Sequence, residues 1–128
     1  MSYYISSTTS GPFEDVIDRT TAALAEEGFG VLTDIDIKAT LKKKLDVDFR
    51  NYRILGACNP PFAHQALLAE SHIGTMLPCN VIVQEHENGD IEVSAVDPEA
   101  SMMGVENDDL AKIAGEVRTR LERAVNKI

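Results

Sequence analysis

The chain has 128 residues, of which 44% are hydrophobic and 26% charged, a balance typical of a folded protein rather than a disordered one. Its 12 basic and 21 acidic residues give a net charge of −9, which argues against nucleic acid and anionic membranes as partners, because phosphate binding needs clustered Lys and Arg. No apolar run approaches the roughly 20 residues that span a bilayer, and the N-terminus lacks the pattern of a secretory signal, so we expect a cytoplasmic protein.

Hydrophobic periodicity predicts two strands and two helices in the first third of the chain. Residues 3–6 form a short strand, and apolar residues at three- and four-residue steps then predict a helix from Pro12 to Gly28. Alternation from Phe29 to Ile37 predicts a strand with one buried face. Ala39–Leu45 is predicted to be a short amphipathic helix.

Three further strands are predicted at residues 52–58, 80–85 and 90–96. Between the last two lies the pair Asn88-Gly89, which is a strong hairpin signal because both residues tolerate positive φ. The chain therefore contains at least one antiparallel strand pair.

Two helices are predicted among and after these strands. Asn59 is a suitable N-cap for a helix that begins at Pro60 and runs to about Glu70. Asn107 is the expected cap of a final helix that extends to Ile128 and carries the clearest apolar stripe in the chain.

The predicted order is β-α-β-α-β-α-β-β-α in one domain over residues 1–128. The late hairpin favours an α+β fold, with a mainly antiparallel sheet and helices packed on one face. A doubly wound α/β fold is the competing interpretation, but a parallel sheet does not use a hairpin.

A candidate site is predicted where three turn-forming, proline-marked segments converge. They carry Cys58 and Asn59 at the end of a strand, Cys79 and Asn80 at the start of another, and Asp97 after the hairpin. A thiolate at Cys58 would lie at the N-terminus of a helix, where the helix dipole lowers a cysteine pKa. The alternative is that both cysteines are small buried residues without chemistry.

His64 lies about one turn into the helix that follows Cys58, so it is a candidate base or metal co-ligand for that thiol. An exposed histidine on a helix surface is the alternative. Cys58 and Cys79 are 21 residues apart and form neither a CxxC pair nor a zinc-ligand spacing. Because the segment offers no third ligand, we expect no metal site and no cofactor.

The segment from Gly30 to Val96 resembles a small prokaryotic family known only as domain of unknown function 302. One departure is Asp46, at a position where a glycine is usual. The resemblance implies a compact α+β domain that forms homodimers, and it implies no reaction, substrate or catalytic residue. The matching segments are residues 29–36, 52–61, 63–64, 74, 77–81 and 95–98.

Three hypotheses about function follow. The first is a domain that binds a small ligand or a partner protein near Cys58, Asn59, His64, Cys79, Asn80 and Asp97. The second is thiol chemistry, either redox sensing or sulfur transfer, with Cys58 as the nucleophile and His64 as its base. The third is a structural homodimer without a small-molecule site. The sequence does not decide whether the protein is an enzyme.

Overall fold

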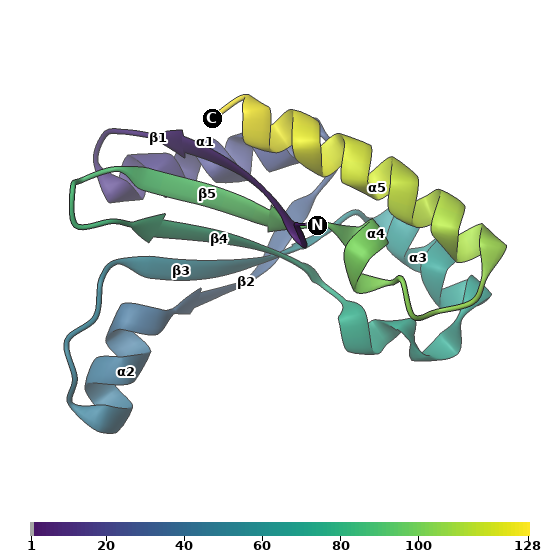
Figure 1. Ribbon diagram of the computed structural model, residues 1–128, viewed down its shortest axis with the longest axis horizontal. Helices are drawn as coiled ribbons and strands as arrows, with labels where there is room; N and C mark the ends of the chain where they lie inside the picture. Colours follow the sequence, from purple (N-terminus) through teal and green to yellow (C-terminus); the bar gives the residue numbers. More distant parts are fainter. Residues whose placement is uncertain (1) are drawn as a thin grey trace.

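The computed structural model describes residues 2–128 and contains a five-stranded sheet with the strand order β1-β5-β4-β3-β2 (Figure 1). Every neighbouring pair of strands is antiparallel, which confirms the α+β prediction and excludes the doubly wound alternative. The strands are β1 (Tyr4–Thr9), β2 (Gly30–Asp36), β3 (Tyr52–Cys58), β4 (Cys79–Glu85) and β5 (Ile91–Val96).

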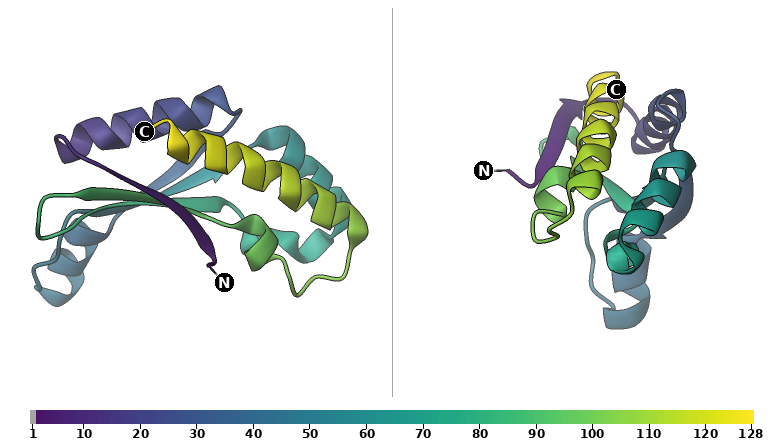
Figure 2. Two further views of the ribbon diagram at one scale, coloured as in Figure 1. Left: turned by 45° about the horizontal axis from the view of Figure 1, so that its top comes forward. Right: turned by 90° about the vertical axis from the view of Figure 1, so that its right-hand side faces the viewer.

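The longest helices cover one face of this sheet, as predicted. Figure 2 shows α1 and α5 together on one side of the sheet and α2 projecting on the other. None of the helices within residues 2–128 is long and apolar enough to cross a membrane. The helices are α1 (Phe13–Glu26), α2 (Ile37–Leu45), α3 (Pro60–Ala69), the 3₁₀ helix η1 (Ser71–Met76), α4 (Pro98–Ser101) and α5 (Asp108–Asn126).

The main core lies between the sheet and the two long helices. Alternate residues of β4 and β5, among them Val83 and Val93, point into it because successive side chains of a strand face opposite sides. Leu24 of α1 and Leu121 of α5 close it from above, each 1% exposed or less. This burial of apolar area is the chief stabilising contribution to the fold.

A second, smaller hydrophobic cluster lies beyond the end of the sheet. Its buried residues are Ala66, Ile73, Met102, Leu110 and Ala114. They come from α3, η1, the segment after α4 and the first half of α5. The two clusters therefore meet where β3 ends and β4 begins, next to α3, and α5 contributes to both.

The predicted alternation of Phe29 to Ile37 is partly wrong. The register of β2 shifts between Val31 and Thr33, a bulge that interrupts the alternation, and Ile35 is 46% exposed. Ile37 is not in the strand, because Asp36 caps α2 there by accepting a hydrogen bond from the backbone N–H of Ala39 at 2.9 Å.

Other local predictions are confirmed. The β4–β5 hairpin turns at Asn88-Gly89, and Gly89 has a φ of +91°. Asn107 caps α5 and accepts hydrogen bonds from the backbone N–H groups of Asp109 and Leu110. β1 runs to Thr9, longer than predicted, and η1 and α4 are additional short helices.

Within the described residues 2–128, most of the opposite face of the sheet is left uncovered, and α2 projects on that side next to β2 and β3 (Figure 2). Ile35, Ile54 and Ile82 are register partners on β2, β3 and β4, so their side chains form one row across this face. Tyr4 and Tyr52 border a hollow of about 430 Å³ on the same face. We refer to this as the uncovered face.

Candidate functional site

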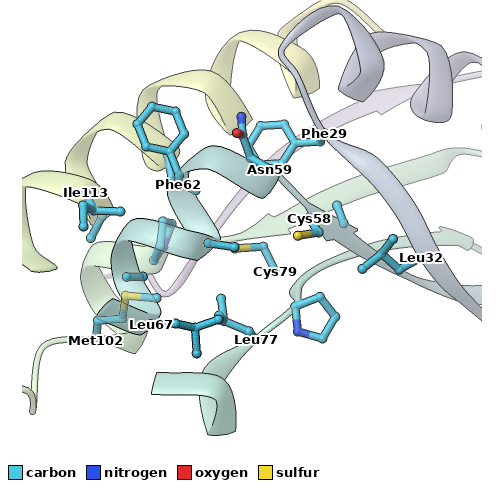
Figure 3. Close-up of a pocket in the computed structure, with 17 residues that line it drawn as sticks. Phe29, Leu32, Cys58, Asn59, Phe62, Leu67, Leu77, Cys79, Met102 and Ile113 are labelled. Carbon is cyan, nitrogen blue, oxygen red and sulfur yellow. The ribbon is translucent and has the colours of Figure 1, made fainter. Parts of the chain in front are cut away.

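A cavity of about 300 Å³ lies where the two hydrophobic clusters meet. Residues from β2, β3, β4, α3 and α5 and from the α4 segment surround it (Figure 3). Its lining residues are Phe29, Leu32, Ala57, Cys58, Asn59, Phe62, Ala63, Ala66, Leu67, Leu77, Pro78, Cys79, Pro98, Met102, Ile113, Ala114 and Val117. Apart from the Asn59 amide and the two thiols, this lining is apolar. We call it the apolar pocket.

The three segments expected to converge do meet at the apolar pocket. Cys58 ends β3, Cys79 begins β4 after the cis Leu77–Pro78 peptide bond, and Pro98 follows Asp97 at the start of α4. Adjacent antiparallel strands bring the first two together, because Ala57 is the register partner of Cys79. β5 pairs with β4, so the third segment, Asp97-Pro98, which follows β5, lies at the same end of the sheet.

The two thiols differ in their surroundings. Cys79 is 7% exposed, whereas Cys58 is only partly buried. Burial, with a smaller contribution from negative charge at Cys58, raises the pKa of the Cys79 thiol to about 11. Cys79 therefore keeps its proton at neutral pH, and Cys58 is the more accessible of the two sulfurs.

Asn59 is buried in the pocket wall at the N-cap position of α3, but its side chain does not cap that helix. Its amide Nδ2 instead donates a hydrogen bond of 3.2 Å to the backbone carbonyl oxygen of Glu27, at the end of α1. Gly28 makes room for it, because a Cβ there would lie 3.0 Å from that nitrogen. Asn59 thus ties α1 to the pocket.

Asp97 lies at the edge of the site but does not line the pocket. Its Oδ1 accepts a hydrogen bond from the backbone N–H of Glu99, which caps α4. Its Oδ2 is 3.1 Å from Nε of Arg118 on α5, and this pairing raises the pKa of the Arg118 guanidinium. Asp97 therefore fastens α4 to α5 and leaves Pro98 facing the pocket.

His64 and Asn80 lie apart from the apolar pocket. His64 is exposed on α3 and is not among the residues that line the pocket. Asn80 follows Cys79 on β4, so it faces the other side of the sheet and borders the hollow on the uncovered face.

Sequence reasoning missed most of the apolar lining. Phe62, Ile113 and Val117 belong to helical stripes, and such stripes look the same whether they fill a core or line a cavity. The alanines of β3, α3 and α5 were one signal that could have indicated a cavity, since small side chains leave space where helices and strands meet. Four of them line the pocket: Ala57, Ala63, Ala66 and Ala114.

Within residues 2–128, no group of three or more His, Cys, Asp and Glu side chains is placed to hold a metal ion. The donors at the pocket are two thiols and one amide that is already hydrogen-bonded. The chemistry that the arrangement offers is therefore apolar contact together with thiol reactivity.

Comparison with known proteins fits this architecture. The family model "Domain of unknown function DUF302" matches residues 5–128. The chain belongs to the DUF302 family. A solved crystal structure of an uncharacterized conserved protein DUF302 from Bacillus stearothermophilus resembles this DUF302 chain with a TM-score of 0.91 and 27% sequence identity. The similarity covers 99% of this chain and 98% of the other. The search of curated proteins found no match to this chain.

Proposed function

We propose that this DUF302 domain binds a small, largely apolar molecule in the apolar pocket. The observation that carries the proposal is a cavity of about 300 Å³ in a chain of only 128 residues, at the junction of two hydrophobic clusters. Such a volume is at the lower end of ligand pockets, which begin at roughly 300 Å³, so the ligand is small.

The lining also favours an uncharged ligand. No Lys, Arg, Asp or Glu lines the pocket, and a charged group placed there would lose its hydration without gaining a partner. The buried Asn59 amide uses one of its two N–H donors to hold the Glu27 carbonyl oxygen, so the polar capacity left in the lining is small and uncharged. Affinity would come from apolar contact with Phe29, Phe62 and Met102.

Thermal denaturation in the presence of small aromatic and aliphatic alcohols tests this proposal. A ligand that binds only the folded state stabilises it by about 2.7 kcal/mol at about 100 times its Kd, which raises the Tm by several degrees. Cumyl alcohol and linear alcohols of increasing length are suitable probes, and we expect a Tm increase that saturates with concentration.

A filled-pocket variant provides the control. Ala63→Phe adds a ring at a pocket-lining position of α3, whereas Gln65→Phe adds one at an exposed position of the same helix outside the pocket. The Tm increase should disappear in the first variant and persist in the second. A ligand response that survives Ala63→Phe would contradict binding in the apolar pocket.

A second copy of the chain is the partner that we propose for the uncovered face. The row of Ile35, Ile54 and Ile82 exposes apolar area that a monomer would leave in water. The helix α2 projects on the same side and has no buried residue. We call residues 37–50 the basic arm, because they include five basic and two acidic residues and so carry a net charge of +3, whereas the whole chain carries −9. A second acidic copy complements this basic arm.

Multi-angle light scattering tests the dimer, and we expect twice the monomer mass at micromolar concentration. Ile54→Asp on the uncovered face should give monomers, and Lys43→Glu/Lys44→Glu on α2 should weaken the dimer without affecting buried residues. Lys112→Glu, an exposed change on α5, is the matched control. A wild-type monomer at tens of micromolar would refute the proposal.

A further inference from the structure

We propose that the apolar pocket reduces an apolar organic hydroperoxide, using Cys58 as the attacking thiol and Cys79 as the thiol that completes a disulfide. This inference rests on the proposed ligand pocket and names the class of its ligand. It is carried by the presence of two free cysteines, on neighbouring strands, in the wall of one small apolar cavity.

The backbone places the two cysteines within reach of each other. Cys79 is the register partner of Ala57, and Cys58 is the next residue along β3. Partner Cα atoms in an antiparallel ladder are about 4.5–5.5 Å apart, and one residue along the strand adds about 3.4 Å. The two Cα atoms are therefore about 6 Å apart, inside the usual range of about 4.4–6.8 Å for a disulfide.

The side chains also meet on one side of the sheet. Strict alternation would send Cys58 to the face opposite Cys79, but Cys58 is the last residue of β3, where the chain turns into α3. Both side chains line the apolar pocket, and in Figure 3 the Cys58 thiol points toward Cys79. A negative charge at Cys58 would raise the pKa of the Cys79 thiol, as expected for two groups this close.

The different surroundings of the two thiols assign their roles. Cys58 is the more exposed sulfur, so an entering molecule meets it first. Its thiolate attacks the terminal oxygen of the hydroperoxide; an S–O bond forms, the O–O bond breaks, and an alkoxide leaves. Cys79 keeps its proton because burial raises its pKa, so its thiol is the proton donor that turns the alkoxide into an alcohol.

The second step consumes the sulfenic acid. The Cys79 thiolate left by that proton transfer attacks the Cys58 sulfur, an S–S bond forms, and hydroxide leaves and becomes water with the proton that Cys58 had lost. In sum, one hydroperoxide and two thiols give one alcohol, one water and one disulfide. The hydroperoxide is reduced and the two sulfurs are oxidised, each by one electron.

The pocket selects the class of oxidant. Burying an aromatic or alkyl group against Phe62, Leu77 and Met102 favours an organic hydroperoxide over hydrogen peroxide, which has no apolar part. The free energy of burying one such group corresponds to about a tenfold difference in rate or more. The absence of charged residues from the lining disfavours anionic peroxides in the same way.

The test mixes the full-length reduced protein with cumene hydroperoxide or with hydrogen peroxide, in equimolar amounts, and follows free thiols and intact mass. We expect loss of both thiols and of two hydrogen atoms in mass, about tenfold faster with cumene hydroperoxide. Peptide mapping should find a Cys58–Cys79 disulfide. Thiols that survive cumene hydroperoxide, or equal rates with both oxidants, would overturn the inference.

Three variants sharpen the test. Cys79→Ser should stop at a Cys58 sulfenic acid that a cyclic diketone traps, and Cys58→Ser should form neither product. Ala63→Phe should remove the rate advantage of cumene hydroperoxide over hydrogen peroxide, while Gln65→Phe, at an exposed position outside the pocket, should behave as wild type. Trapping at Cys79 instead of Cys58 would reverse the assigned roles and contradict the inference.

Cumyl alcohol separates this inference from the proposed function, because it has the shape of cumene hydroperoxide but cannot oxidise a thiol. If it raises the Tm while cumene hydroperoxide leaves both thiols intact, the pocket binds apolar molecules and the peroxide chemistry is refuted. If it leaves the Tm unchanged, the ligand pocket itself is refuted and the inference falls with it.

Discussion

Gly56 lies at a crowded position of β3, between β2 and the start of β4. A Cβ at this position would lie 2.2 Å from Oγ1 of Thr33 on β2 and 2.8 Å from Cγ of Pro78 before β4. Gly56→Ala should therefore destabilise the fold by about 1–3 kcal/mol, the usual cost of overpacking. Urea unfolding measures this change as a lower midpoint.

Gly30 supplies the matched control for that substitution. It also lies in a strand and next to β3, but a Cβ there would have no atom within 4 Å. Gly30→Ala should leave the unfolding midpoint nearly unchanged or raise it slightly. Equal losses of stability in the two variants would show that crowding is not the cause.

Asp46 ends α2 in the left-handed conformation, with a φ of 53°. Glycine adopts this conformation without steric cost, so Asp46→Gly should stabilise the protein by about 0.5–1 kcal/mol. The 3.0 Å ion pair with Lys42 that is lost is exposed and contributes little. A decrease in Tm, or a gain shared by Asp46→Ala, would contradict this explanation.

At the scale of elements, Asp97 holds the short helix α4 against α5. Removing its side chain in Asp97→Ala loses the cap on Glu99 and the ion pair with Arg118, which keeps Glu122 as a partner, with an expected cost of about 1–2 kcal/mol. Asp97→Asn keeps a capping oxygen and should cost less. Because Pro98 and Met102 line the apolar pocket, the alanine variant should also weaken the Tm response to cumyl alcohol.

Some features of the helices and strands could be predicted from the sequence and others could not. The stripe of α5 and the Asn88-Gly89 turn were predictable because each depends on local periodicity or on a residue that tolerates positive φ. The exposure of β2 could not be predicted from the sequence, because it depends on a bulge and on the position of this strand at the edge of the sheet. Both of these are set by pairing with distant residues.

The candidate site was predictable only in part for the same reason. Cys58, Cys79 and Pro98 are marked by local turn signals, so their segments could be singled out and their meeting proposed. The volume between them depends on how closely Ala66 and Ala114 let two helices approach, which no single segment encodes. The different burial of the two thiols likewise emerges only from the packed structure.

At the scale of the whole molecule, Glu27 joins the end of α1 to the end of α5. Its carboxylate accepts hydrogen bonds from Nζ of Lys127 at 2.7 Å and Nε of Arg123 at 2.9 Å. These contacts, chiefly the one with Lys127, lower the pKa of Glu27 from its ordinary value near 4.5. A carboxyl whose pKa is lower in the folded state stabilises the fold above its ordinary pKa, and this stabilisation is lost as the pH falls through the folded-state value.

Glu27→Gln should therefore lower the free energy of unfolding at neutral pH and reduce its decline between pH 5 and more acidic conditions. Urea unfolding over a pH series measures both effects. Glu26→Gln is the control, because Glu26 also pairs with Lys127 at 3.0 Å but its side chain is 64% exposed. A pH profile of Glu27→Gln that parallels wild type would rule out this linkage.

The position of β1 has a consequence for how the chain acquires its structure. Within residues 2–128, β1 pairs with β5 alone, so the hydrogen bonds between Tyr4 and Val96 cannot form until residue 96 has been synthesised. Contacts between such distant residues slow folding. On the ribosome, β1 therefore emerges long before β5, and the sheet is completed only after residue 96 has been made.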